Sequence, residues 1–142
     1  MSKMILIDAT DLVLGRLAAY TAKQALLGET VNIINAEKAV ITGKPEMVLA
    51  QQKRKRDMGA PLIGPYYPRM SERIVKRTIR GMLSHKNPRG KEAFAKIKCY
   101  CGTPDALKAQ KAITFEHMNV HSKNVKYITI AQISKHLGAK IE

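Results

Sequence analysis

The order of apolar segments in the first 42 residues constrains the fold more than any other feature of the sequence. Residues 4–8 form a short apolar run that ends in an aspartate, and β-branched residues recur at 31–34 and at 39–42. Between the first two runs, apolar residues have the spacing of one helix face, with Asp11 as the expected N-cap and Gly28 just after the helix. A strand, a crossover helix and a second strand are typical of a parallel sheet. We therefore expect an α/β fold.

The rest of the chain reads as helices separated by loops. A loop with three prolines and two glycines is predicted at 59–70, and residues 113–127 show no clear pattern. A strand is predicted at 96–101. Further helices are predicted to begin at Pro45, Ser71 (as a cap), Pro88, Thr103 and Thr129, the last with the capping-box partner Gln132 and an end at Gly138.

The chain shows no internal repeat and no stretch that resembles a domain linker. At 142 residues it is long enough for one self-supporting core but short for two. We expect a single domain over 1–142, with a basic insertion at about 53–98 and a C-terminal appendage at about 103–142.

Positive charge is concentrated in the middle of the sequence. The chain has 25 Lys and Arg against 11 Asp and Glu, a formal net charge of +14. Residues 1–52 carry no net charge, residues 53–98 carry an excess of 11 positive charges, and residues 99–142 carry an excess of 3. Such a concentrated field repels itself unless a partner neutralises it. The pattern favours a nucleic-acid phosphate backbone as that partner.

The predicted helix at 71–83 separates its residue types by face. At about 100° per residue, Ile74 and Ile79 fall on one side and a stripe of basic residues falls on nearly the opposite side. A merely solvated basic surface is the alternative for these cations. The candidate phosphate-binding residues are Lys53, Arg54, Lys55, Arg56, Arg69, Arg73, Lys76, Arg77, Arg80, His85, Lys86, Arg89 and Lys91.

Tyr66 and Tyr67 lie in the proline-rich loop between two basic helices. Their rings are candidates for stacking on unpaired RNA bases. Packing of the loop against its own helix is the alternative, and the scarcity of aromatic residues favours it.

No pattern in the sequence indicates an enzyme, a cofactor or a metal site. Cys99 and Cys101, followed by His117 and His121, come close to zinc-finger spacing, but a single residue between the cysteines does not make the usual knuckle. Packing of both thiols is favoured. The carboxylates are scattered, and no nucleophile and base are adjacent. We expect no catalytic residues, no cofactor and no small-molecule substrate.

The sequence also argues against a membrane or secreted protein. No apolar run approaches the roughly 20 residues of a membrane span, and the first apolar run is too short for a signal peptide. Two cysteines this close are too few for a disulfide framework. A cytoplasmic protein is expected.

Five short sequence segments occur together, and their order and spacing resemble those of one known family. They are GRLAA at 15–19, NAEKAVITG at 35–43, GPYYPR at 64–69, RGMLSHKNPRGKEAF at 80–94 and KCYCGTP at 98–104. The chain is similar to the universal large-subunit ribosomal protein thirteen family, in its archaeal and eukaryotic form. The resemblance implies a three-layer α/β/α fold with a four-stranded parallel sheet of order 3-2-1-4, whose strands would be 4–8, 31–35, 39–42 and 97–101.

The resemblance also implies a function. Members are structural, non-catalytic proteins that bind large-subunit ribosomal RNA, lie beside other ribosomal proteins and act early in subunit assembly. Ser84 stands where the family usually has proline, and Cys99 and Cys101 replace aliphatic residues. A free-standing RNA-binding translational regulator is the main alternative. A small α/β enzyme with a site at the strand ends is a weaker one.

Overall fold

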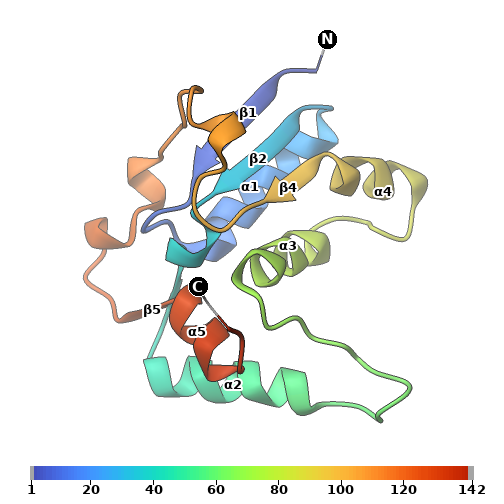
Figure 1. The fold of residues 1–142 in the computed structure, drawn as a ribbon, viewed down its shortest axis with the longest axis vertical. Coiled ribbons are helices and arrows are strands. Elements are labelled where there is room, and N and C mark those ends of the chain that lie inside the picture. Colours follow the sequence, from blue (N-terminus) through green and yellow to red (C-terminus); the bar gives the residue numbers. More distant parts are fainter. Residues whose placement is uncertain (1, 141–142) are drawn as a thin grey trace.

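The computed structural model describes residues 2–140 and has a mixed α/β fold (Figure 1). This confirms the α/β class that the sequence predicted. The strands are β1 (Met4–Asp8), β2 (Thr30–Ile34), β3 (Val40–Thr42), β4 (Ile97–Cys99) and β5 (Tyr127–Thr129). The helices are α1 (Leu14–Leu26), α2 (Pro45–Asp57), α3 (Ser71–Gly81), α4 (Pro88–Ala95) and α5 (Ile130–His136).

The parallel sheet has three strands, with β2 in the centre, β1 on one side and β4 on the other. Ile33 of β2 is in register with Ile7 of β1 and with Cys99 of β4. The expected four-stranded sheet of order 3-2-1-4 is therefore wrong. Strand β3 pairs antiparallel with β5 in a separate ribbon, where Val40 is opposite Thr129.

The short connection after β2 explains why β3 does not join the parallel sheet. Two neighbouring parallel strands need a crossover of about a dozen residues or more, but only residues 35–39 separate β2 from β3. The chain turns away at Asn35, whose φ is +54°, and at a 3₁₀ turn over Ala36–Lys38. The outer edge of β1 is bonded instead to Ile113, whose amide donates to the Leu6 carbonyl at 2.8 Å.

The main core lies between the sheet and the helices. Its largest fully buried residues include Ile7, Leu17, Ile33, Ile74, Ile79, Ile97, Ile130 and Ile133, which come from both sheet and helices. The C-terminal segment thus contributes to the same core as the βαβ unit.

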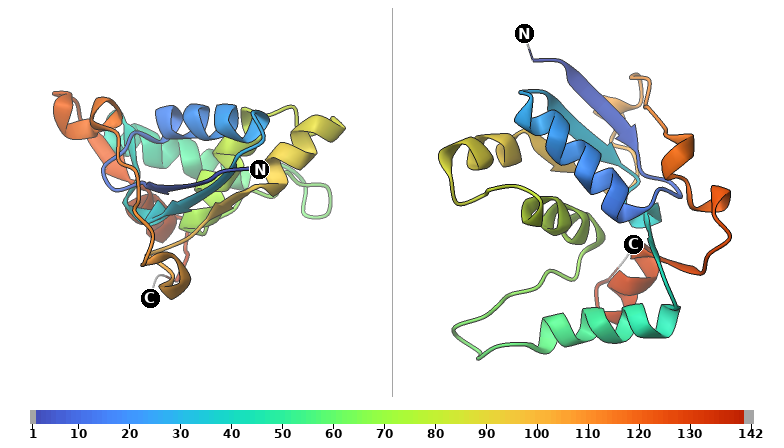
Figure 2. Two further views of the ribbon diagram at one scale, coloured as in Figure 1. Left: turned by 90° about the horizontal axis from the view of Figure 1, so that it is seen from above. Right: turned by 180° about the vertical axis from the view of Figure 1, so that it is seen from behind.

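The second face of the sheet is covered by an irregular segment. Leu6 and Ile34 pack there against Leu107, with Tyr100 and Ala112 beside them. Figure 2 shows α1 on one side of the sheet and this segment on the other. The helix predicted from Thr103 is wrong, because only a 3₁₀ turn forms, at Asp105–Leu107. The outer layer on this side is therefore not the helical layer that an α/β/α sandwich implies.

Two predicted helix caps are also wrong, and two helix ends are as predicted. Asp11 has a φ of +59°, and Val13 is the N-cap of α1, because residues 12 and 13 first bridge to other segments. Ser71 is the first residue of α3 and does not cap it. Gly28 follows α1 with a φ of +100°, and Thr129 forms the predicted capping box with Gln132.

Within residues 2–140, no helix has the length and apolarity that crossing a membrane requires.

Glycine at position 90 is required by the approach of α4 to the preceding turn. A β-carbon there would collide with the backbone carbonyl of Ser84, whereas one at Gly81 of α3 would meet nothing within 4 Å. We expect Gly90→Ala to lower the free energy of unfolding by about 1–3 kcal/mol. The control Gly81→Ala should be neutral or stabilising by up to about 1 kcal/mol. Urea unfolding followed by circular dichroism measures both, and equal stability of the two variants would contradict this account.

Candidate nucleic-acid interface

Helix α3 has an apolar side in the core and a basic side at the surface. Ile74, Val75 and Ile79 are buried against the rest of the core. On the other side, Arg73 is exposed and Lys76, Arg77 and Arg80 are half-buried. The predicted separation of the two residue types is confirmed. The helix fixes the direction of these cations because its apolar side leaves it no freedom to rotate.

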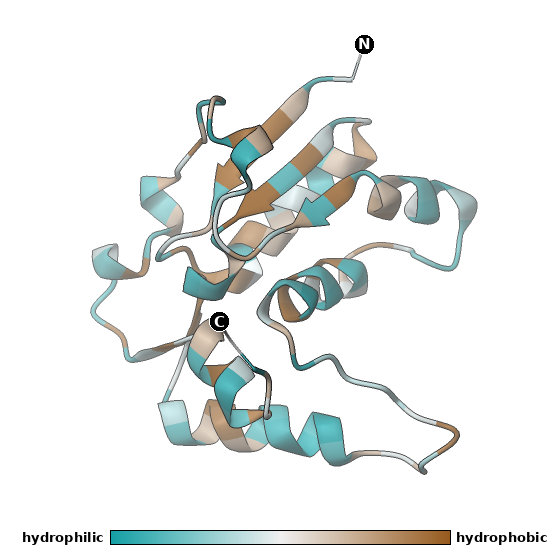
Figure 3. Cartoon of the chain, viewed as in Figure 1, coloured by the Kyte–Doolittle hydropathy of each residue, from teal (hydrophilic) through white to brown (hydrophobic). Residues whose placement is uncertain are grey.

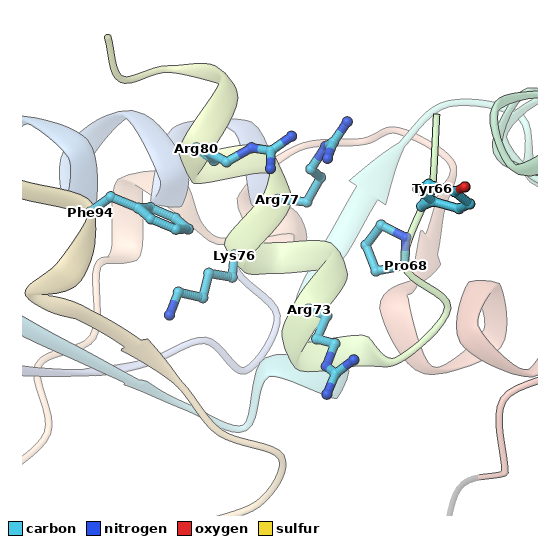
Figure 4. Close-up of a pocket in the computed structure, with 7 residues that line it drawn as sticks. All are labelled: Tyr66, Pro68, Arg73, Lys76, Arg77, Arg80 and Phe94. Atoms are coloured by element: carbon cyan, nitrogen blue, oxygen red, sulfur yellow. The ribbon is translucent and has the colours of Figure 1, made fainter. Parts of the chain in front are cut away.

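These four cations surround a hollow of about 320 Å³ at the surface (Figure 4). The other lining residues are Tyr66 and Pro68 from the loop before α3, and Phe94 from α4. Among residues 2–140, no carboxylate lines the hollow. Within residues 2–140, Lys108 forms an ion pair with Asp105 and the His121 imidazole lies near the Asp11 carboxylate, so neither pair includes a cation of the hollow. In the described part of the chain, the positive charge of this site is uncompensated.

Tyr67 connects α2 to α3. The ammonium nitrogen of Lys55 lies 5.8 Å from the centre of its ring, and the guanidinium carbon of Arg77 lies 6.0 Å from it. Burial raises the pKa of the Tyr67 hydroxyl, although Arg77 acts in the opposite direction. Both cations lie near the ring in cation–π geometry. Tyr67 is half-buried and packs against Lys55 and Arg77, and its contact with RNA stays a prediction, whereas Tyr66 is 69% exposed.

The basic end of α2 lies next to α5 and the loop. Lys53, Arg54, Lys55 and Arg56 are all exposed in the last turns of the helix, where cations also complement the helix dipole. The guanidinium of Arg56 donates a hydrogen bond to the carbonyl oxygen of Leu137, at the end of α5. Figure 3 shows this half of α2 as hydrophilic and the tip of the following loop as hydrophobic. Lys55 is linked to α3 through Tyr67.

The remaining predicted residues do not line the hollow. Arg69 is exposed, and its carbonyl accepts a hydrogen bond from the Ser134 hydroxyl at 2.6 Å. The others belong to the turn before α4 and to α4 itself: His85 is half-buried, and Lys86, Arg89 and Lys91 are exposed. Arg89 lines a second hollow of about 260 Å³ with Leu26, Ser84, Asn87 and Gly90.

Two residues of the hollow were not predicted from the sequence. Phe94 has its ring 5.0 Å from the ammonium nitrogen of Lys76, which links α4 to α3. In the sequence, Phe94 follows Ala93 in a short predicted helix, and this pattern is typical of a core residue. Pro68 has no distinctive signal among the other prolines of the loop.

The cysteines and histidines that came close to zinc-finger spacing are engaged separately. Burial raises the pKa of the Cys99 thiol to about 12. The Cys101 sulfur donates to a Glu72 carboxylate oxygen at 3.0 Å. His121 lies 3.3 Å from the carboxylate of Asp11, and His117 packs edge-on against Phe115. Over residues 2–140, no three His, Cys, Asp or Glu side chains are grouped so that they could hold a metal ion.

Comparison with known proteins identifies the family. Residues 2–106 match the family described as Ribosomal protein L13. The chain belongs to the ribosomal protein L13 family. The family that was predicted from the five sequence segments is thus confirmed. Because L13 proteins are structural ribosomal components, the prediction that the chain is not an enzyme is confirmed as well.

Three archaeal relatives share this similarity over nearly the whole chain, and each is named large ribosomal subunit protein uL13. The protein of Archaeoglobus fulgidus is 44% identical over 134 residues, which cover 93% of this chain and 86% of the relative. The proteins of Methanosarcina barkeri and Methanocaldococcus jannaschii are each 43% identical, and the matches cover 96% of this chain and 99% of each relative.

The Cys101 thiol of this L13 protein should react slowly although it is exposed. Although the residue is exposed as a whole, partial burial of its sulfur and the hydrogen bond to the Glu72 carboxylate raise the pKa of the thiol to about 12. In a Cys99→Ser background, Glu72→Gln removes the negative charge, so the pKa should fall and the thiolate fraction should rise about tenfold per pKa unit. The rate of alkylation by iodoacetamide at pH 8 measures this. Glu92→Gln is the control, and equal rates for the two variants would contradict the role of Glu72.

Proposed function

We propose that this L13 protein is a structural constituent of the large ribosomal subunit and binds large-subunit ribosomal RNA through one basic face. The basic face is formed by the end of α2, the loop to α3, the outer side of α3, and α4 with the turn before it. The observation that carries the proposal is the hollow on α3, where four cations gather and no carboxylate of residues 2–140 joins them. The names of the archaeal relatives, each a large-subunit protein, support the same assembly.

Arginine and lysine have distinct tasks in this mechanism. The guanidinium groups of Arg73, Arg77 and Arg80 offer fork-shaped donors that fit phosphate oxygens in pairs. Lys76 supplies a compact charge beside them. Phosphate contacts position a protein on RNA and release condensed counterions, which provides most of the affinity. The proposed role of the fold is to hold these groups in one fixed arrangement.

We further propose that the chain acts in cytoplasmic ribosomes, joins the subunit early and lies beside other ribosomal proteins. The charge distribution supports early joining. A basic face that spans several elements needs several RNA segments at once, and these segments are most accessible before later proteins cover them. RNA binding also relieves the repulsion among the clustered cations.

Binding should depend strongly on salt. If 6–10 side chains contact phosphates, affinity for large-subunit RNA fragments should fall about 10³- to 10⁵-fold between 50 and 200 mM salt. Fluorescence anisotropy of the purified chain with labelled RNA measures this. Strong binding with a flat salt response would contradict the electrostatic mechanism.

The combined substitution Arg73→Glu, Arg77→Glu and Arg80→Glu should block incorporation into large subunits and leave the fold intact. The three side chains face away from the core, so the free energy of unfolding should change little. Sedimentation through a moderate-salt gradient shows whether the chain migrates with large subunits, and urea unfolding reports the fold.

The matched control carries Lys108→Glu, Lys111→Glu and Lys123→Glu, which change the net charge equally but lie outside the basic face. It should incorporate normally. Normal incorporation of the arginine variant would overturn the proposed face. A wild-type chain that binds RNA but never sediments with large subunits would instead indicate a free-standing translational regulator.

A further inference from the structure

The loop between α2 and α3 is closed on itself. The amide nitrogens of Ile63 and Gly64 donate to the carbonyl oxygen of Ala60 at 3.2 and 3.1 Å. Gly59 has a φ of +93°, and a β-carbon there would collide with the Gly64 carbonyl. These contacts give the loop a defined shape without any partner.

Tyr66 is the exposed aromatic ring that this loop presents. Its hydroxyl donates to the carbonyl oxygen of Pro61 at 3.3 Å. Its ring lies over Gly64, where an added β-carbon would come within 3.2 Å of two ring carbons. The ring is thus held at its hydroxyl end and over part of its surface, and the side chain remains 69% exposed. Such a ring loses little conformational freedom when a flat group stacks on it.

The hollow combines apolar rings with positive charge. Figure 4 shows Tyr66 and Pro68 side by side at one end of the hollow, with Arg77 and Arg80 extending from α3. Its volume of about 320 Å³ is near the lower limit of small-ligand sites, so it suits one flat group and its attached charge. A ligand that brings a flat ring and adjacent negative charges is a nucleotide.

We propose that the hollow binds one unpaired nucleotide of RNA, whose base stacks on Tyr66 and Pro68 and whose flanking phosphates contact the arginines of α3. This inference rests on the proposed function and adds to it the recognition of RNA shape. A fully paired helix offers phosphates but keeps its base faces covered. A bulged or looped nucleotide offers both, and RNA-binding proteins stack such bases on aromatic side chains.

The charge of the hollow favours RNA over a protein partner. Four cations surround the apolar rings, and a protein would have to supply several acidic groups to match them. RNA brings a phosphate with every nucleotide. The exposed aliphatic pair Leu62 and Ile63, at the tip of the loop, does not line the hollow. An exposed aliphatic pair close to Tyr66 in the sequence would also suit a protein partner. Contact of Tyr66 with a protein is the competing outcome that the experiments below test.

The first experiment compares two RNA hairpins that bind the full-length chain. They differ by one bulged 2-aminopurine, whose fluorescence falls when the base stacks. The bulged hairpin should bind roughly 5- to 150-fold more tightly than the paired one, with quenching. Tyr66→Ala should remove both effects, and Tyr66→Phe should keep most of both, because the stacking ring remains although its hydrogen bond to Pro61 is lost. Leu62→Ala, at the tip, is the control and should behave as wild type.

The outcomes separate this inference from the proposed function. Equal affinity for both hairpins, with strong salt dependence and no effect of Tyr66→Ala, overturns the nucleotide site and leaves the basic face standing. Absence of binding to either hairpin counts against both proposals.

A second experiment uses large subunits that carry a photo-reactive benzoylphenylalanine at position 66. A cross-link to one unpaired nucleotide supports the site. A cross-link to a paired helix or to a ribosomal protein overturns it.

Discussion

The burial of the apolar side of α3 is the interaction on which the basic face depends. Ile74, Val75 and Ile79 lie in the main core, and each such side chain contributes about 1.5–3 kcal/mol when it is removed from water. A helix packed in this way cannot rotate about its axis without exposing these residues. Its remaining positions therefore point outward in a fixed order. The hydrophobic effect, which acts on one side of the helix, thereby sets the geometry of the charges on the other side.

The C-terminal segment supports this arrangement from the far end of the sequence. Strand β5 pairs with β3, so α5 comes to lie against the elements that carry the cations. Arg56 of α2 donates to the Leu137 carbonyl, and the Ser134 hydroxyl donates to the Arg69 carbonyl just before α3. The loop between α2 and α3 is thus tied at both ends to α5. A segment that the sequence suggested was an appendage is part of the frame of the basic face.

The features that could be predicted from the sequence are those that depend on local periodicity. The βαβ unit, the apolar and basic sides of α3, and the capping box at Thr129 each follow from the spacing of residues that are near one another in the sequence. The sheet order taken from the family resemblance was wrong. The strand patterns alone do not say which edges pair, but the five residues between β2 and β3 already excluded a parallel crossover. The prediction that Asp11 caps α1 was wrong because residues 12 and 13 form bridges to distant segments, so the helix begins only at Leu14. Likewise, the basic residues were visible as a charge cluster, but only the fold brings Phe94 and Pro68 to the same hollow.

Aromatic rings hold three cations of the basic face without neutralising them. Lys55 and Arg77 lie beside the Tyr67 ring, and Lys76 lies beside the Phe94 ring, in positions where a carboxylate would have made ion pairs. A cation–π contact orients a charged group and covers its stem, but it leaves the net charge unchanged. A carboxylate would give stronger positioning but would reduce the positive field of the surface. For the RNA-binding role proposed above, the surface has to be both ordered and positive, and an aromatic partner meets both requirements, whereas an acidic partner meets only the first.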